Sequence, residues 1–387
     1  MVEWGVPPRP SSSILARRLA AHRLVPRVAV DPADIVSHLC AVQSQEYALA
    51  LWAIGQRAQA TSAAYVERAA DEGRILRTHI LRPTWHFVAP ADIRWMLALT
   101  SPRVHQGNAT RYHQLGLDAA TRQKARRLIT RALERTTALT RTELAAALAR
   151  GGIPASGQRL AYLVMHEELD GILCSGPRRG SQSTYALLAR RAPSGRALPR
   201  DEALPTLLRR YLAGHAPATV HDFAWWSGLT IADARLAAAA LGSEVEWVDA
   251  EAGAHVPERY MALAAATGPA QPSPTPRAWL LPAYDEYLVA YRHRRLVAGD
   301  IPPMQALDSS VVIGGVRVGT WKRTTGTASL DVRLARPLSA SVQRLIERAA
   351  REYAAFAGLD LTVSVQVPRP GARPRPSPAG AARATRR

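Results

Sequence analysis

The pattern of apolar and polar positions over the first 118 residues is mostly helical, with one extended interruption. Asp31 followed by Pro32 is typical of a helix N-terminus, because aspartate caps the helix and proline suits its first turn. The stretches on either side of Leu81-Arg82-Pro83 favour strands instead. The predicted elements are helices over Ile35–Val42, Ala48–Gln56 and Pro90–Leu99, and strands over Leu76–His79 and Thr84–Val88.

Residues 119–195 and 196–263 share one plan, in which helices are followed by a hairpin. Thr140-Arg-Thr-Glu143 and Thr219-Val-His-Asp222 have capping-box spacing, with an acid three residues after the threonine that caps the helix. This order is typical of winged helices, and residues 1–118 resemble a looser copy. The predicted helices are Arg122–Arg135, Thr140–Ala149, Ser156–Glu168, 219–228 and 230–242, and the predicted strands are Ile172–Ser175, Thr184–Leu188, Val245–Asp249 and His255–Met261.

The pattern changes after a Pro- and Ala-rich linker at residues 264–277. Residues 278–367 are expected to form a small β-barrel-like domain, with Gly314-Gly315 as a hairpin turn. Residues 368–387 contain six arginines and no acid, which predicts a disordered basic tail. The predicted fold class is α+β, mostly α, with tandem winged-helix units before the barrel-like domain. The elements predicted for the barrel-like domain are strands over Val311–Ile313, Val316–Trp321, Ala328–Leu334 and Leu361–Val367, and a helix over Leu338–Leu359.

Composition excludes several classes of protein. The chain has 387 residues, of which 47% are hydrophobic, so it can form several globular domains. No apolar run approaches the ~18 residues of a membrane span, and the N-terminus lacks the layout of a signal peptide. We therefore expect a cytoplasmic protein without a membrane partner. Cys40 and Cys174 form no CxxC pair and predict neither a cysteine zinc site nor a disulfide framework.

The charge balance points to a nucleic-acid partner. The formal net charge is +19, and all basic residues except Lys124 and Lys322 are arginines. A guanidinium group matches phosphate oxygens and guanine edges with two hydrogen bonds, and basic chains bind nucleic acid through phosphate contacts. A GC-rich genome would also favour arginine over lysine. It explains the ratio of arginine to lysine but not the excess of basic residues over acids.

Two carboxamides lie two residues apart in Cys40-Ala-Val-Gln43-Ser44-Gln45-Glu46-Tyr47. On a helix their side chains would point about 200° apart, whereas in extended backbone they share one side. They can converge on one small polar group only if the helix breaks before Gln43; otherwise they are a pair of surface glutamines. The sequence contains no Walker loop, HExxH, GxSxG or metal-ligand spacing, so neither a cofactor nor a metal is expected.

Three further segments combine aromatic and basic residues, and each has a structural alternative. Residues 77–87 predict either of two arrangements. They form a surface that binds phosphates and stacks on a base, or they place a tryptophan in the core and leave the arginines in solvent. Residues 280–295 end in a basic cluster, and their Asp285 is either an acid–base group or a cap. Residues 319–326 suit a hairpin that probes a groove, or a turn whose Trp321 plugs a barrel. A further candidate is the basic wing, Arg178-Arg179, between the predicted strands Ile172–Ser175 and Thr184–Leu188. The candidate DNA-binding residues are therefore Arg77, His79, Arg82, His86, Arg178, Arg179, Arg292, Arg294, Arg295, Trp321, Lys322 and Arg323.

Taken in order, five segments resemble the AlkZ-like DNA glycosylases, a winged-helix family that also includes YcaQ. They span about residues 11–365 and occur in the order of the family. The resemblance implies tandem winged helices and a C-terminal β-barrel around a concave, positively charged DNA surface. The segments are AVQSQEYALALWAIGQR, RTHILRPTWHFVAPADIRWML, TVHDFAWWSGLTIADAR, LLPAYDEYLVAYRHR and VRVGTWKR.

The catalytic motif of this family is Gln-hydrophobic-Gln or Gln-hydrophobic-Asp, and it corresponds here to Gln43-Ser44-Gln45. Ser44 departs from the hydrophobic centre, and the carboxylate of Glu46 follows directly. The resemblance implies that Gln43 and Gln45 are catalytic. Glutamine cannot take a proton as Asp or His can, but it can hold a water and place carbonyl oxygens near positive charge.

These roles suffice for a base that leaves easily, such as a cationic N7-alkylguanine. We therefore predict a monofunctional glycosylase that acts as a monomer on alkylated purines in duplex DNA, with bulky adducts or crosslinks as further substrates. No lysine is placed for strand cleavage, and Lys124 belongs to a basic helix face. The sequence allows two modes of excision: the base is extruded from the duplex first, or it is excised in place. The alternatives are a non-catalytic winged-helix DNA-binding protein or regulator, and a basic chain whose β-rich domain binds a small molecule.

Overall fold

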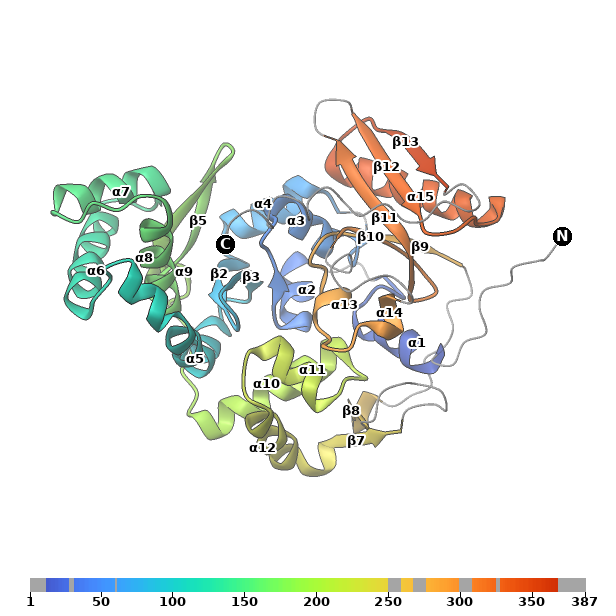
Figure 1. The fold of residues 1–387 in the computed structure, drawn as a ribbon, viewed down its shortest axis with the longest axis horizontal. Coiled ribbons are helices and arrows are strands. Elements are labelled where there is room, and N and C mark those ends of the chain that lie inside the picture. The colour runs from blue at the N-terminus through green and yellow to red at the C-terminus, as the bar shows by residue number, and fades with distance from the viewer. Residues whose placement is uncertain are drawn as a thin grey trace.

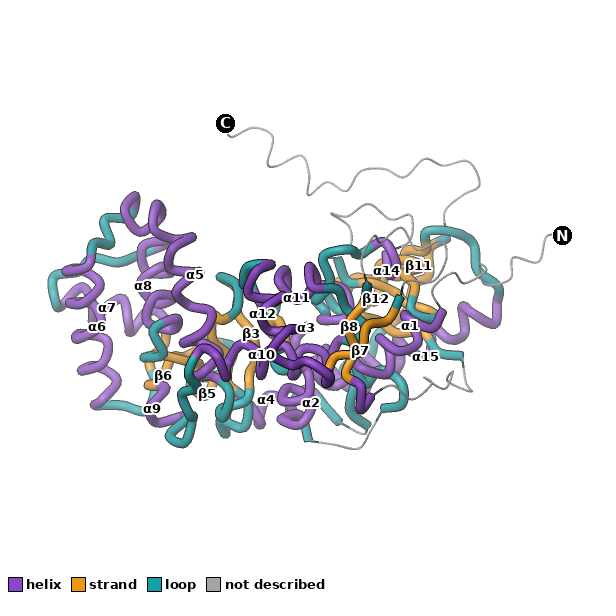
Figure 2. Tube along the Cα trace, turned by 90° about the horizontal axis from the view of Figure 1, so that it is seen from below, coloured by secondary structure: helices purple, strands orange, loops and turns teal. Residues whose placement is uncertain are grey.

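The computed structural model describes residues 12–27, 31–59, 61–249, 259–266, 276–298, 308–324 and 328–367. The molecule is elongated, with helices α6 (Ala119–Glu134) and α7 (Arg141–Arg150) at one end (Figures 1 and 2). The C-terminal strands and helix α15 (Ala340–Ala357) lie at the other end. Among the described residues, no helix is long and apolar enough to cross a membrane. Most of the predicted linker and all of the predicted basic tail lie outside the described residues.

Helix α1 (Ser12–Ala21) precedes a first unit of helices and a three-stranded antiparallel sheet with the order β1-β3-β2. The two predicted strands are confirmed, but helix α2 ends earlier than its predicted end at Val42. The helix stops because Cys40 has a φ of 65° and the next residues, Val42 and Gln43, pair with β3. The elements are α2 (Pro32–Leu39), β1 (Val42–Gln43), α3 (Tyr47–Gly55), α4 (Ala63–Asp71), β2 (Leu76–Ile80) and β3 (Thr84–Val88).

The second unit repeats this layout, with the strand order β4-β6-β5. The predicted capping box at Thr140 is confirmed, whereas the side chain of Ser156 makes no cap hydrogen bond. Helix α5 runs far beyond its predicted end at Leu99, because Val104, Asn108 and Tyr112 are buried at four-residue spacing. Helix α5 (Ile93–Gln114) joins the first unit to the second, and the elements of the second unit are α6, β4 (Leu139–Thr140), α7, α8 (Gly157–Leu169), β5 (Leu173–Arg179), β6 (Gln182–Leu187) and α9 (Leu188–Arg191).

The third unit again joins helices to a two-stranded hairpin. The predicted capping box at Thr219 is confirmed, a further capping box forms at Thr230, and Gly228 ends its helix in the left-handed conformation. The predicted strand over His255–Met261 lies partly outside the described residues. The elements are α10 (Arg200–His215), α11 (Val220–Ser227), α12 (Ile231–Leu241), the 3-10 turn η1 (Gly242–Glu244), β7 (Val245–Val248), β8 (Tyr260–Leu263) and the 3-10 turn η2 (Ala264–Ala266).

One pairing recurs in all three units. A residue before the second helix of each unit pairs with the last strand of the hairpin: Gln43 with His86, Thr140 with Thr184, and Ala218 with Met261. The three units therefore share a topology, and Gln43 occupies the same topological position as Thr140 and Ala218.

The C-terminal strands form an open five-stranded sheet in the part of the chain that is described, which corrects the predicted barrel. The strand order is β13-β12-β11-β10-β9, so β9 and β13 are free edges. The chain crosses from β12 to the parallel strand β13 through α15, and this helix covers apolar residues that a barrel would enclose. The elements are β9 (Ala278–Leu281), α13 (Glu286–Val289), α14 (Arg295–Ala298), β10 (Ser310–Ile313), β11 (Val316–Thr324), β12 (Ser329–Leu334), α15 and β13 (Thr362–Gln366).

The first unit lies at the centre of the molecule and shares its apolar cores with its neighbours (Figure 1). One core joins β2 to α5 and to α10–α12. A second core joins α2, α3 and α4 to the C-terminal sheet and α15, and Trp52 of α3 donates a hydrogen bond to the Leu280 carbonyl. Segments that are far apart in sequence therefore meet around β1, where Gln43 lies.

Candidate active site around Gln43

The backbone is extended where the two predicted glutamines begin. Gln43 pairs with His86 across β1 and β3, and the Ser44 N–H donates to the Trp85 carbonyl at 2.7 Å. The helix therefore breaks before Gln43, as the convergence of the two carboxamides requires. The Gln43 side chain is 7% exposed, whereas Gln45 is exposed in a bend before α3. The motif thus has one buried end in the sheet and one end at the surface.

The buried carboxylate of Glu286 holds the backbone of Gln43. Its Oε1 accepts the Gln43 N–H at 2.7 Å, and its Oε2 accepts the Trp226 indole N–H at 3.0 Å. The Nε2 atom of His215 lies 3.7 Å from Oε2. Burial alone would raise the pKa of Glu286, but its contacts with His215, His86 and the Gln43 N–H hold the pKa below its usual value. Glu286 is therefore a buried negative charge next to Gln43.

Asp285 fixes the position of Glu286. The Arg57 guanidinium binds both Asp285 oxygens, at 2.9 and 2.7 Å, and the Gln56 amide donates to the same carboxylate. Asp285 also accepts the Tyr287 N–H at 2.9 Å as the N-cap of α13. The interpretation of Asp285 as a cap is confirmed. Its carboxylate is occupied by these partners and is buried, so it is not available as an acid or base.

The loop that carries Gln45 differs from its counterparts in the other units. In those units a threonine caps the following helix with its side chain. In the first unit α3 begins only at Tyr47, and Glu46 occupies the N-cap position without a side-chain cap hydrogen bond. Residues 44–46 therefore separate the strand from the helix without a capping role. Polar side chains that do not serve local structure are available for chemistry.

Arg77 and His79 lie on the opposite face of this small sheet from Gln43. Gln43 faces His86, and side chains alternate along β2, so Arg77 and His79 project to the other side. There Arg77 donates to the Ser44 carbonyl and lies 4.3 Å from the Trp85 ring, while His79 contacts the buried Glu168. The adjoining cavity of about 20 Å³ holds about one water and no nucleobase.

Three predicted DNA contacts are corrected, because their side chains are buried: His79, which is bound to Glu168, His86 and Trp321. His86 is fully buried, and burial lowers its pKa to about 4, so it is neutral near pH 7. Trp321 is also buried; its indole N–H donates to the Leu281 carbonyl at 2.8 Å and its ring packs on Tyr353. Trp321 is a core residue of the C-terminal sheet. Of the two interpretations of residues 319–326, this agrees with a turn whose tryptophan is structural and not with a hairpin that probes a DNA groove.

The remaining basic candidates are dispersed. Arg178 and Arg179 of the β5–β6 hairpin are paired with Glu67 at 3.1 Å and with Glu143 at 2.8 Å. Arg292 and Lys322 are exposed, Arg323 is half-buried, and nothing is described of the Arg295 side chain. Arg82 and Arg294 lie together beside Trp225, and Arg82 also lies near Glu286. Arg82 and Arg294 were thus named as candidates from the sequence, but Trp225 and Glu286 were missed. The only signal for these two residues was their position inside segments that resemble the family.

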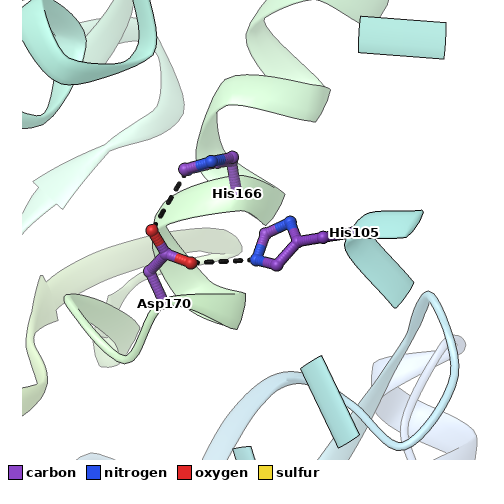
Figure 3. A group of neighbouring side chains, drawn as sticks. All are labelled: His105, His166 and Asp170. Atoms are coloured by element: carbon purple, nitrogen blue, oxygen red, sulfur yellow. Dashed lines mark hydrogen bonds and ion pairs between the residues drawn. The ribbon is translucent and has the colours of Figure 1, made fainter. Parts of the chain in front are cut away.

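Among the described residues, one group has the geometry of metal ligands: His105 on α5 with His166 and Asp170 at the end of α8 (Figure 3). The ligand atoms lie within 4.8 Å of one another, and His105 Nε2 lies 2.9 Å from Asp170 Oδ1. The Arg126 guanidinium binds the same carboxylate and thus already supplies positive charge there. The group acts as a polar network between α5, α6 and α8, a juxtaposition that the sequence spacing did not reveal.

The sequence matches the family described as DNA glycosylase AlkZ-like over residues 36–356, so the chain belongs to the AlkZ-like DNA glycosylase family. This confirms the resemblance and makes the protein a DNA glycosylase. It is 27% identical over 347 residues to the interstrand DNA cross-link repair glycosylase of Streptomyces sahachiroi, covering 80% of this chain and 86% of that protein. The structure of Streptomyces sahachiroi DNA glycosylase AlkZ has the same fold, with a TM-score of 0.76 and 23% identity over 92% of this chain and 99% of that one.

Proposed function

We propose that this protein is a monofunctional glycosylase that hydrolyses the N-glycosidic bond of cationic, N7-alkylated purines in duplex DNA and leaves an abasic site. One arrangement carries the proposal. Gln43 is held on an extended strand by the Glu286 carboxylate, and Gln45 is exposed in the loop that follows. In this proposal Gln43 and Gln45 are the catalytic residues.

The arrangement suits a leaving group that needs no acid. An N7-alkylguanine is positively charged and departs as a neutral base, so the enzyme has to stabilise the sugar cation and direct water to C1′. The two carboxamides can hold that water, and the carboxylate of Glu286 supplies negative charge from a buried position where it is weakly screened. Such positioning and electrostatics are worth several kcal/mol.

Strand cleavage after excision is not part of the proposal. Cleavage by β-elimination starts with an amine that attacks the abasic sugar. The two lysines of the chain lie on α6 and β11, on different elements from Gln43 and Glu286. The abasic site is therefore the expected product.

We also infer that the three units are winged helices that bind duplex DNA. Their shared pairing of a residue before the second helix with the last hairpin strand supports this assignment. The proposed domains are 1–118, 119–195 and 196–263, followed by the C-terminal β domain at 278–367. The protein is proposed to act as a monomer, in the cytoplasm and on the nucleoid.

The name of the curated relative extends the range of substrates to be tested. That protein is described as acting on interstrand DNA cross-links, and it matches most of this chain at 27% identity. We therefore include N7-linked crosslinks and bulky N7 adducts among the proposed substrates, beside small N7-alkyl groups.

The experiment measures release of base from duplex DNA that carries N7-methylguanine, and separately from a duplex with an N7-linked crosslink. The wild type should release base faster than the spontaneous rate on at least one of them. Gln43→Ala and Gln45→Ala should each lower the single-turnover rate by about 10²-fold, because they remove groups that act in the transition state. Affinity for the duplex should change less than about threefold.

Gln59→Ala is the matched control, because Gln59 is an exposed glutamine after α3 that donates to the Arg27 carbonyl. It should excise at the wild-type rate. Release no faster than the spontaneous rate on both substrates, or unchanged rates in both active-site variants, would overturn the proposal.

A further inference from the structure

Trp225 is an exposed tryptophan held in a fixed position. It lies on α11, is 41% exposed, and donates its indole N–H to the Val289 carbonyl at 3.1 Å. Single exposed aromatic residues are common on protein surfaces, so exposure alone does not mark a binding residue. The hydrogen bond of Trp225 fixes its ring where it is open to solvent, and the meaning of this position comes from the residues around it.

Two arginines lie against this ring. The guanidinium carbons of Arg82 and Arg294 are 5.6 and 5.5 Å from the ring centroid, within the range of a cation–π contact. Arg82 comes from the β2–β3 turn, and Arg294 from the segment after α13. The indole therefore brings together cations that are distant in the sequence.

The two guanidinium groups have unused hydrogen-bond donors. Arg82 Nε, Arg82 Nη2 and Arg294 Nε are buried and have no hydrogen-bond partner among the described residues. Burial lowers the pKa of both arginines, and the charge of Arg82 lowers the pKa of Arg294 further. Two neighbouring positive charges that have lost part of their hydration repel each other, and an anion bound between them would offset this repulsion.

The group is built rigidly and lies on the Gln43 side of the first unit. Gly228 follows α11 with a φ of 72°, and a Cβ there would lie 2.4 Å from the Leu81 carbonyl oxygen, so the end of α11 packs directly on the turn that carries Arg82. Arg82 is also close enough to Glu286 for that carboxylate to raise its pKa. The same carboxylate holds the Gln43 backbone.

We propose that Arg82, Trp225 and Arg294 form a clamp for one backbone phosphate of the DNA, next to the nucleotide that Gln43 and Gln45 attack. The phosphate oxygens are bound by the guanidinium nitrogens that are not buried, which are Arg82 Nη1 and both Nη atoms of Arg294. Trp225 keeps both cations in place and contacts the adjoining deoxyribose. The position beside the excised nucleotide rests on the proposed function; the phosphate site itself requires only that the protein binds DNA.

The first experiment compares duplex affinity at several salt concentrations, with a duplex that carries 2′-fluoro-N7-methylguanosine so that excision is blocked. Arg294→Gln should weaken binding about fivefold to tenfold and reduce the salt slope by about one, as loss of one phosphate contact predicts. Trp225→Ala should weaken binding similarly, and Trp225→Phe should weaken it less than Trp225→Ala does, because phenylalanine keeps a ring under the cations but loses the hydrogen bond to Val289.

Two matched variants serve as controls. Trp247→Ala removes a tryptophan of similar exposure, 40%, on β7, and Arg209→Gln removes an exposed arginine that is paired with Glu244. Both should bind as the wild type does. Loss of affinity in the controls that equals the loss in Trp225→Ala and Arg294→Gln would overturn the clamp.

The second experiment locates the phosphate. Phosphates near the lesion are replaced one at a time by neutral methylphosphonate. At one position the wild type should lose the same factor as Arg294→Gln, and Arg294→Gln should lose no more there. If the losses of affinity caused by the methylphosphonate and by Arg294→Gln add fully at every position, the clamp is contradicted.

The clamp and the proposed function fail in different ways. Excision of N7-methylguanine together with normal affinity in all clamp variants would remove the clamp and leave the glycosylase proposal intact. Absence of excision together with reduced affinity and salt slope in Arg294→Gln would leave a phosphate site and remove the proposed reaction.

Discussion

Gln43 shows how a weak two-residue motif acquires a defined environment. Its backbone N–H binds a carboxylate that lies 243 positions away in the sequence, and that carboxylate also binds the Trp226 indole. The residue types of the motif were visible in the sequence. The negative charge beside them was not, because nothing local links Glu286 to the first unit.

Glu286 should be required both for stability and for the rate of excision. In Glu286→Gln the amide offers only one oxygen, so either the Gln43 N–H or the Trp226 N–H loses its acceptor. We expect a loss of about 2–4 kcal/mol in the free energy of unfolding. Removal of the charge should also lower the single-turnover excision rate at saturating DNA by at least tenfold. Chemical denaturation and base release measure the two effects.

Glu352→Gln is the matched control, since Glu352 is a half-buried carboxylate on α15 that is paired with Arg27 at 3.0 Å. Its excision rate should equal that of the wild type. A folded Glu286→Gln protein that excises at the wild-type rate would show that the carboxylate only supports the fold.

At the scale of single elements, local signals predicted most helix starts correctly. The capping boxes at Thr140 and Thr219 form as predicted, because the threonine and its acid are three residues apart and need no distant partner. Helix ends were less predictable. Helix α2 stops where Val42 and Gln43 pair with β3, and that competition from a strand is not visible in the helix itself.

The polar network of Figure 3 joins α5 to α8, Arg126 adds α6 to it, and the network should make stability depend on pH. Burial raises the pKa of Asp170, but its contacts with His105, His166 and Arg126 outweigh burial and lower the pKa to about 2. A carboxylate with a lowered pKa stabilises the fold above its usual pKa, and this stabilisation is lost as pH falls from about 4 through about 2.

Asp170→Asn should therefore lower the free energy of unfolding by about 1–2 kcal/mol near pH 6, and by progressively less below pH 4. Chemical denaturation at pH 6, 4 and 3 measures this difference. Asp249→Asn is the control, because its pair with Arg259 is highly exposed and should contribute little. A difference that stays constant over this pH range would show that the carboxylate charge is not the stabilising feature.

For the whole molecule, net charge predicts how binding depends on salt. A chain with a formal charge of +19 that contacts about six phosphates should lose duplex affinity with a log–log slope of about −5 against salt. Residues 368–387 contain six arginines, so the protein truncated after residue 367 should bind more weakly and with a shallower slope. Its excision rate at saturating DNA should not change.

Fluorescence anisotropy with unmodified duplex at 50 to 300 mM salt provides the measurement. Affinity that does not change with salt would contradict phosphate binding altogether. An unchanged slope after truncation would restrict phosphate contact to the part of the chain before residue 368.

The sequence by itself determined the repeated helix-and-hairpin plan, the basic character, the family and the position of Gln43 and Gln45, because local periodicity, caps, charge and ordered motifs are properties of the chain alone. Only the tertiary structure decided that the C-terminal sheet is open and that His86 and Trp321 are buried. It also decided that Glu286 lies against Gln43 and that Trp225 joins Arg82 to Arg294. These features depend on packing between segments that are not adjacent in the sequence, up to 243 positions apart for Gln43 and Glu286, which no local pattern encodes.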